Sequence, residues 1–195
     1  MILLHHKVIF QHIQKTGGTT MHKLFKFSPK VGTIQMPCGM HFCLTDMLEK
    51  IPHMDINDYE VLTVKRNPWD RFASLHIDTV RNYELGVVPN PPVNWYNYFA
   101  GLQRVDDMVD KLFVDGQLPP NLTMLNFDNL ANEFCPWWEK TMGYTLMEFP
   151  RLNRKPEQRY TDLRMHMVND PKFQDEIYRL CRAEIEYFGW ELPSY

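Results

Sequence analysis

The sequence lacks any aspartate or glutamate before Asp46, although lysines are frequent in that segment. They are Lys7, Lys15, Lys23, Lys26 and Lys30. The whole chain of 195 residues nevertheless has a formal net charge of −3. A chain with this balance has no general basic surface, so we do not expect nucleic acid as a partner. The uneven distribution predicts instead that the N-terminal part of the fold attracts an anion.

Long apolar runs are also missing. No stretch approaches the roughly 20 apolar residues that are needed to cross a bilayer. Met1–Leu4 is followed at once by His5, His6 and Lys7, which leaves no room for a secretory signal peptide. The four cysteines lack paired C-x-x-C spacing, and reduced structural thiols are the better interpretation. We therefore expect a cytoplasmic protein without a membrane span.

Composition favours a globular protein. Hydrophobic residues make up 44% of the chain and aromatic residues 13%, which is enough for a full core. The length suits a single domain that covers residues 1–195, and two domains are not expected. No internal repeat, heptad pattern or low-complexity tract interrupts it.

A short apolar run, Val8–Ile13, stops at a lysine, two glycines and two threonines before a helical pattern begins. The run is typical of a strand buried in a parallel sheet. The glycines permit positive φ and a close approach of a ligand, and the amides of the following helix start attract anions. The sequence thus predicts a strand, a phosphate-binding loop and a helix. The candidate ligands are Lys15, Thr16, Gly17, Gly18, Thr19 and Thr20.

A second anion-binding turn is predicted after the strand Tyr59–Val64. Asn67 fits a helix N-cap and Pro68 the first helical position, so a helix should begin at Pro68. Arg66 precedes the cap and Ser74 lies two turns along the helix, so both can converge on an anion at the carboxyl edge of the sheet. An ordinary capped helix with a solvated arginine is the alternative. On this helix, Trp69, Phe72, Ala73, His76 and Val80 should face the core, while Arg71 and Asp78 should point elsewhere.

Later parts of the chain continue the alternation of strands and helices. A helix is predicted from Pro171, capped by Asp170 and stopped by Gly189. The other predicted elements are a short strand at Val31–Ile34, short helices at Leu44–Ile51, near Trp95–Phe99 and at Asp106–Val114, a strand at Met124–Phe127, and a helix at Asn129–Met142 interrupted near Pro136.

The two anion motifs resemble those of the sulfotransferases that use PAPS (3′-phosphoadenosine 5′-phosphosulfate), particularly the carbohydrate-modifying branch. His12–Thr20 is similar to their 5′-phosphosulfate loop, in which lysine precedes the glycines; Gln14 departs from the usual proline. Arg66 and Ser74 match the arginine and serine that hold the 3′-phosphate. The resemblance implies a three-layer α/β/α fold with a central, mainly parallel sheet, the P-loop-like fold of the family.

The resemblance also points to a basic loop late in the chain that closes over the 3′-phosphate. Arg154 and Lys155 are the candidates, although a solvated basic loop explains them equally well. The family implies PAPS as sulfuryl donor, adenosine 3′,5′-bisphosphate as product and no metal ion. The sequence agrees in having no H-E-x-x-H motif and no acidic magnesium cluster.

Sulfuryl transfer needs a stabilised leaving group and a base. Lys15 is placed to take the charge that grows on the leaving phosphate. His41 is the candidate base, since it lies between the two anion motifs, and Asp46 and Glu49 remain possible. Related glycan 2-O-sulfotransferases use a histidine in the corresponding segment.

We therefore expect a sulfotransferase that acts on a hydroxyl of a carbohydrate or another small acceptor. A non-catalytic module that binds PAPS or its product is one alternative, and an atypical P-loop nucleotide kinase is another. The acceptor would be chosen by Val87–Phe99 or Gln35–Phe42, because such segments vary freely on this kind of fold.

Overall fold

The computed structural model describes residues 1–27, 33–34, 41–92, 94–100, 102, 105, 107–146, 149 and 158–194. The chain forms two compact units. We call the first, Met1–Arg66 with Met108–Leu152, the sheet unit, and the second, Asn67–Asp107 with Asn153–Tyr195, the helical unit. The expectation of one domain over residues 1–195 stays a prediction.

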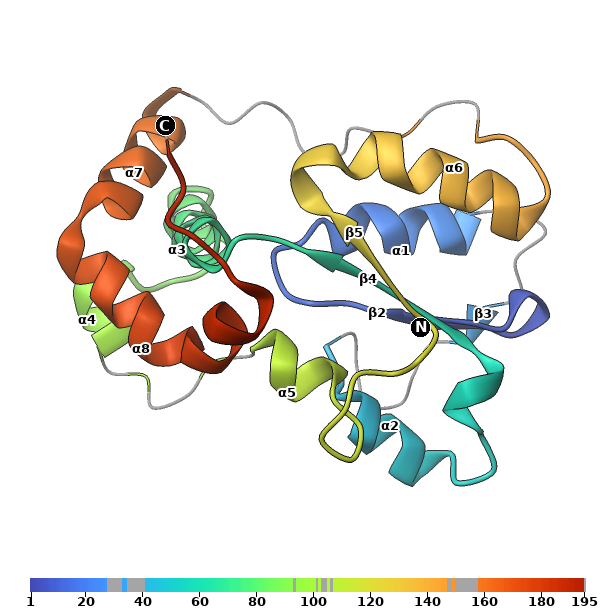
Figure 1. The fold of residues 1–195 in the computed structure, drawn as a ribbon. Helices are drawn as coiled ribbons and strands as arrows, with labels where there is room; N and C mark the ends of the chain where they lie inside the picture. The colour runs from blue at the N-terminus through green and yellow to red at the C-terminus, as the bar shows by residue number, and fades with distance from the viewer. Residues whose placement is uncertain are drawn as a thin grey trace. The chain divides into compact units, whose positions relative to one another are not determined.

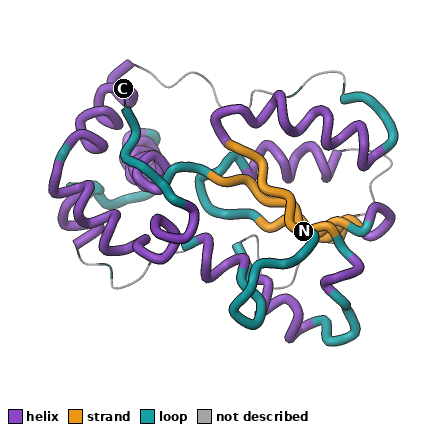
Figure 2. The backbone as a smooth tube through the Cα atoms, viewed as in Figure 1, coloured by secondary structure: helices purple, strands orange, loops and turns teal. Residues whose placement is uncertain are grey.

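The sheet unit contains a five-stranded sheet in the order β3-β1-β2-β4-β5 (Figures 1 and 2). The strands are β1 (Ile2–Leu3), β2 (Val8–Gln11), β3 (Thr33–Ile34), β4 (Glu60–Lys65) and β5 (Leu122–Asn126). The three longest strands, β2, β4 and β5, run parallel, whereas the two-residue strand β1 pairs antiparallel with β2 and β3. The predicted strands at Val8 and Tyr59 are confirmed, and the sheet is mixed but mostly parallel.

Helices lie on both faces of this sheet. Figure 1 shows α1 (Gly18–Phe27) and α6 (Leu130–Met142) on one face, and α2 (Leu44–Lys50) and α5 (Met108–Leu112) on the other. Among the described residues, this unit also has three short 3₁₀ helices: η1 (Leu4–His6), η2 (Ile56–Asp58) and η3 (Phe127–Asn129). The α/β class is thus confirmed, and the arrangement is compatible with three layers.

An aromatic core joins the α1 and α6 face to the sheet. Phe25 of α1 stacks on Trp138 of α6, with ring centroids 5.8 Å apart, and both are buried with Phe10 of β2. The interruption predicted near Pro136 is wrong, because α6 is continuous through it. Pro136 lies on the exposed side, and the buried Phe134 and Trp138 hold the helix on both sides of it.

In the described part of the helical unit the helices are α3 (Pro68–Glu84), α4 (Trp95–Ala100), α7 (Gln158–Asn169) and α8 (Pro171–Phe188). The predicted caps are confirmed. The Asn67 side chain accepts a hydrogen bond from Trp69 N, and the Asp170 side chain accepts one from Lys172 N. Gly189 ends α8 in the left-handed conformation, as predicted.

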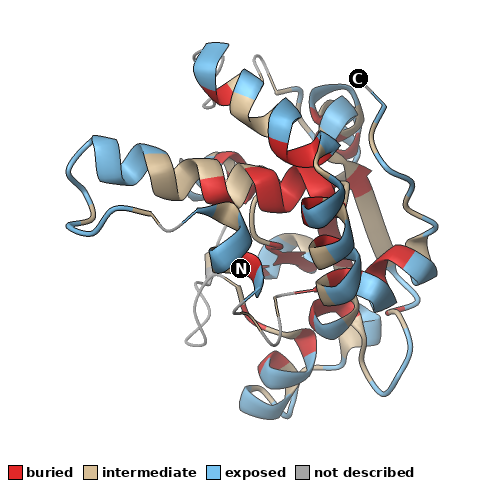
Figure 3. Cartoon of the chain, turned by 90° about the vertical axis from the view of Figure 1, so that its left-hand side faces the viewer, coloured by how far each residue is buried: buried red, intermediate tan, exposed pale blue. Residues whose placement is uncertain are grey.

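Two features of the helical unit differ from the sequence prediction. Helix α7 was not predicted from the sequence. Arg71 was expected to point away from the core but is only 2% exposed, and its guanidinium pairs with the fully buried Glu184 of α8. All residues of α3 from Pro68 to Ala73 are buried, so Arg71 lies on a side of the helix that is covered by packing; Figure 3 colours the chain by burial. The ion pair between Arg71 of α3 and Glu184 of α8 explains how a charged side chain can be buried on that side of the helix, because a buried charge is tolerated when it is paired.

Three results bear on the predicted environment of the chain. Within the described ranges, no helix is both long and apolar enough to cross a membrane. Cys43, Cys135 and Cys181 form no disulfide with one another, while Cys38 lies outside the described residues. No group of three or more His, Cys, Asp or Glu side chains that could hold a metal ion occurs in the part of the chain that the structure describes.

Candidate functional site

The predicted phosphate-binding loop connects the carboxyl end of β2 to the N-terminus of α1, over residues 12–17. The first bonds of the helix run from Thr20 N and Met21 N to Gly17 O, at 3.0 and 3.4 Å. The first amides of an α-helix have no acceptor within the helix, so they can donate to an anion. The sequence predicted this strand, loop and helix correctly, and they bring Thr16, Gly17, Gly18, Thr19 and Thr20 into one turn.

The backbone of the loop is held in an unusual conformation. Lys15 has φ 65° and Gly17 has φ 80°. Positive φ is uncommon for a residue other than glycine and is concentrated at ligand-binding turns. The Thr16 hydroxyl donates to Ile13 O at 2.7 Å, which closes the turn from inside. Lys15 is therefore presented from a tight, internally bonded turn, with its side chain half-buried.

Arg66 meets this loop from the end of β4. Its Nη1 donates to Lys15 O at 2.9 Å, and its guanidinium carbon lies 4.1 Å from the centre of the Phe127 ring. The side chain is buried, with 7% of its surface exposed. Arg66 thus supports the strained Lys15 peptide and brings a second positive charge to the loop. This contact between the two predicted anion motifs was not foreseen from the sequence.

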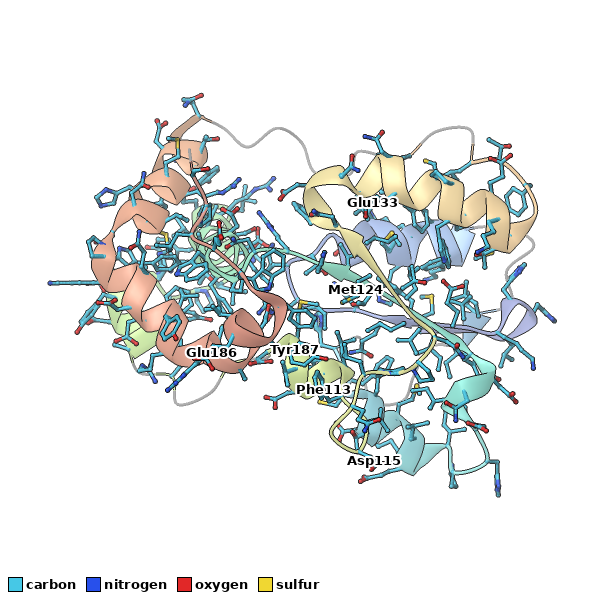
Figure 4. All side chains as sticks on the ribbon, viewed as in Figure 1. Phe113, Asp115, Met124, Glu133, Glu186 and Tyr187 are labelled. Carbon is cyan, nitrogen blue, oxygen red and sulfur yellow. The ribbon has the colours of Figure 1, made fainter. Side chains whose placement is uncertain are left out.

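Phe127 was not predicted as part of the site. It begins η3, directly after β5, and the register pairs Lys65 of β4 with Asn126 of β5. The turn is fixed because Asn126 N donates to a carboxylate oxygen of Glu133 at 2.6 Å; Figure 4 labels Glu133 near the start of α6. Once β4 and β5 are known to be parallel neighbours, Arg66 and Phe127 are adjacent. That pairing is the signal that the sequence alone could not supply.

Gly18 is required for packing as well as for access to the backbone. A Cβ atom on Gly18 would lie 1.8 to 2.4 Å from three atoms of the His12 ring. The ring is buried against its neighbours: its centroid lies 6.0 Å from that of Phe10 and 4.4 Å from that of His41. His12 therefore fills the space that a side chain at position 18 would take.

The rings of His22 and His41 both lie next to that of His12, with centroids 5.2 and 4.4 Å away. Burial lowers the pKa of His12 to about 3, with smaller contributions from His41, His22, the N-terminal ammonium group and Lys15. Burial likewise lowers the pKa of His22 to about 4. Both rings are neutral at pH 7, so the positive charge at the loop belongs to Lys15 and Arg66 rather than to these histidines.

His41 lies beside the loop, where the sequence placed the base. Its Nδ1 is 3.3 Å from His12 O. A carbonyl oxygen can only accept, so this hydrogen bond requires the proton of a neutral His41 ring to be on Nδ1. Nε2 then carries a lone pair and can accept a proton. The alternative bases, Asp46 and Glu49, are exposed on α2.

The remaining predicted ligands lie elsewhere in the chain. Ser74 belongs to α3 of the helical unit and is half-buried, whereas Arg66 belongs to the sheet unit. The joint 3′-phosphate site of Arg66 and Ser74 stays a prediction. Arg154 and Lys155 lie outside the described residues.

Comparison with known proteins gives no family. No protein-family model matches the sequence, and neither a curated protein nor a solved structure matches it. The assignment of a function therefore rests on the residues of the site.

Proposed function

We propose that this protein is a PAPS-dependent sulfotransferase with a P-loop-like fold, acting on a hydroxyl of a carbohydrate or another small acceptor. One observation carries the proposal: the loop that presents Lys15 at the carboxyl end of β2 is bonded to Arg66 from the end of the neighbouring parallel strand, β4. Two basic groups and a helix N-terminus thus meet at the sheet edge where α/β proteins bind their ligands.

The residues present fit the 5′ end of PAPS. The amides at the start of α1 and the Lys15 ammonium group would bind the 5′-phosphosulfate, because both favour negative charge and neither needs a metal ion. Arg66 would bind the 3′-phosphate with Ser74, and Arg154 and Lys155 would close over it. The lysine before the glycines, rather than after them, distinguishes this loop from the nucleotide-kinase P-loop.

The chemistry follows from these positions. Bound PAPS supplies the sulfuryl group. His41 Nε2 takes the proton of the acceptor hydroxyl as the new O–S bond forms and the phosphate O–S bond breaks. Lys15 and the loop amides stabilise the charge that develops on the leaving phosphate oxygen, so that adenosine 3′,5′-bisphosphate departs. Catalysis then rests on position and electrostatics, as in phosphoryl transfer.

Two experiments test this function against its alternatives. Calorimetry should detect binding of adenosine 3′,5′-bisphosphate and much weaker binding of ATP with Mg²⁺; the reverse preference would indicate a nucleotide kinase. Transfer of radiolabelled sulfate from PAPS to a panel of carbohydrate and phenolic acceptors then separates an enzyme from a binding module. Binding without transfer to any acceptor would favour the module.

A further inference from the structure

The backbone of His41 and Phe42 is held by two side chains from separate elements of the sheet unit. Lys111 of α5 donates from Nζ to His41 O at 2.5 Å. Gln11, the last residue of β2, donates from Nε2 to Phe42 O. With the bond between the His41 ring and His12 O, this segment is attached at three points.

Lys111 is an unusual residue for such a contact, because only 8% of its surface is exposed. Burying an ammonium group costs free energy unless its donors are hydrogen-bonded. One of its three donors is used on the carbonyl of the candidate base.

Helix α5 is suited to deliver this side chain. Met108 and Leu112 are fully buried on either side of Lys111. The Thr45 hydroxyl of α2 donates to Phe113 O, directly after α5, at 3.2 Å. The position of Lys111 is therefore fixed by packing, and its bond to His41 O holds the backbone of His41 in place.

We propose that Lys111 is a positioning residue for His41. Its bond to His41 O keeps the imidazole ring of His41 against His12, and the bond from Nδ1 to His12 O sets the direction of Nε2. This inference rests on the proposed function, in which His41 is the base. Without the bond from Lys111 to His41 O, the His41 ring could move out of reach of the acceptor proton, while the groups that bind PAPS would stay unchanged. A base displaced by about 1 Å can cost on the order of 100-fold in rate.

The test compares Lys111→Met, Lys111→Arg and a control, Lys140→Met, whose lysine is exposed on α6. For Lys111→Met we expect kcat to fall by about 10- to 100-fold, while the KM for PAPS and the midpoint of urea unfolding stay near those of the unchanged protein. Lys111→Arg, which keeps a cationic donor, should restore part of the rate. Lys140→Met should change none of these three quantities. If Lys111→Met does not fold, Lys111→Gln takes its place.

A second readout does not depend on any transferase activity. In a protein labelled with ¹⁵N-histidine, the imidazole signals of His41, assigned with a His41→Gln variant, should shift or broaden in Lys111→Met. Those of the exposed His53 should not. Unchanged His41 signals and unchanged kcat would overturn the role of Lys111. Shifted signals in a protein that does not bind adenosine 3′,5′-bisphosphate would instead refute the proposed function and leave the positioning contact intact.

Discussion

Replacing Gly18 by alanine has two opposing effects on the free energy of unfolding, and the sign of each is known. Gly18 is the first residue of α1 and has no positive φ, so helix propensity alone favours alanine by up to about 1 kcal/mol. The added Cβ would, however, fall 1.8 Å from His12 Cδ2. Overpacking of a core typically costs about 1–3 kcal/mol. We expect a net loss of about 1–2 kcal/mol of unfolding free energy.

Urea denaturation measures this change. With a slope of about 2 kcal/mol per molar urea, the midpoint should fall by about 0.5–1 M. The His12 ring cannot easily give way, since Phe10, His22 and His41 surround it. Binding of adenosine 3′,5′-bisphosphate should weaken as well, because the loop must move with the ring.

A double-mutant cycle identifies the cause. In a His12→Ala background the ring is gone, so Gly18→Ala should become neutral or stabilising. This reversal of sign is specific to the predicted clash. If Gly18→Ala stabilises the unmodified protein, or if its cost is the same in both backgrounds, the packing described for the loop is wrong.

Three further predictions concern charge. Arg66→Ala should weaken bisphosphate binding by about 2–5 kcal/mol in calorimetry; unchanged affinity would place the 3′-phosphate elsewhere. Because the pKa of His12 is about 3 in the folded protein and 6.5 for an unperturbed histidine, the unfolded chain binds more protons below pH 6.5. Unfolding free energy should therefore fall as the pH is lowered from 6.5. His12 contributes about 2 kcal/mol of this loss at pH 5, and His22, whose pKa is lowered to about 4, adds to it, so a His12→Asn variant measured in the same titration should show a clearly shallower slope. Glu184→Gln removes the charge that faces buried Arg71 and should cost about 3–5 kcal/mol in urea unfolding. Glu186→Gln, on the exposed side of α8, should cost little, and equal losses would contradict the role of burial.

The sequence predicted features that short-range chemistry determines. The start of α3 follows from Asn67 and Pro68, and the ends of α8 follow from Asp170 and Gly189. The loop before α1 follows in the same way from an apolar run that stops at two glycines. Each of these depends on residues within a few positions of one another, which is the range over which a pattern can be interpreted without the fold.

Features that depend on distant residues could not be predicted. The helical period of α3 treats Arg71 as a surface residue, because Glu184 is 113 positions away. The bonds of Arg66 to Lys15 O and of Lys111 to His41 O likewise join residues 51 and 70 positions apart. The glycines were interpreted as places for a ligand, whereas Gly18 also accommodates the His12 ring. Such roles become visible only when strand order and packing are known.

The most direct test of the central claim is the affinity for adenosine 3′,5′-bisphosphate of the unchanged protein, Lys15→Ala and Lys7→Ala. The two lysines flank β2, and both have positive φ, 50° for Lys7 and 65° for Lys15, so their replacement imposes a similar change on the backbone. We predict binding by the unchanged protein and by Lys7→Ala, and binding at least about tenfold weaker by Lys15→Ala, because a charge-assisted hydrogen bond is worth about 1.5–3 kcal/mol. Absence of binding, or equal affinities for the two variants, would contradict the account.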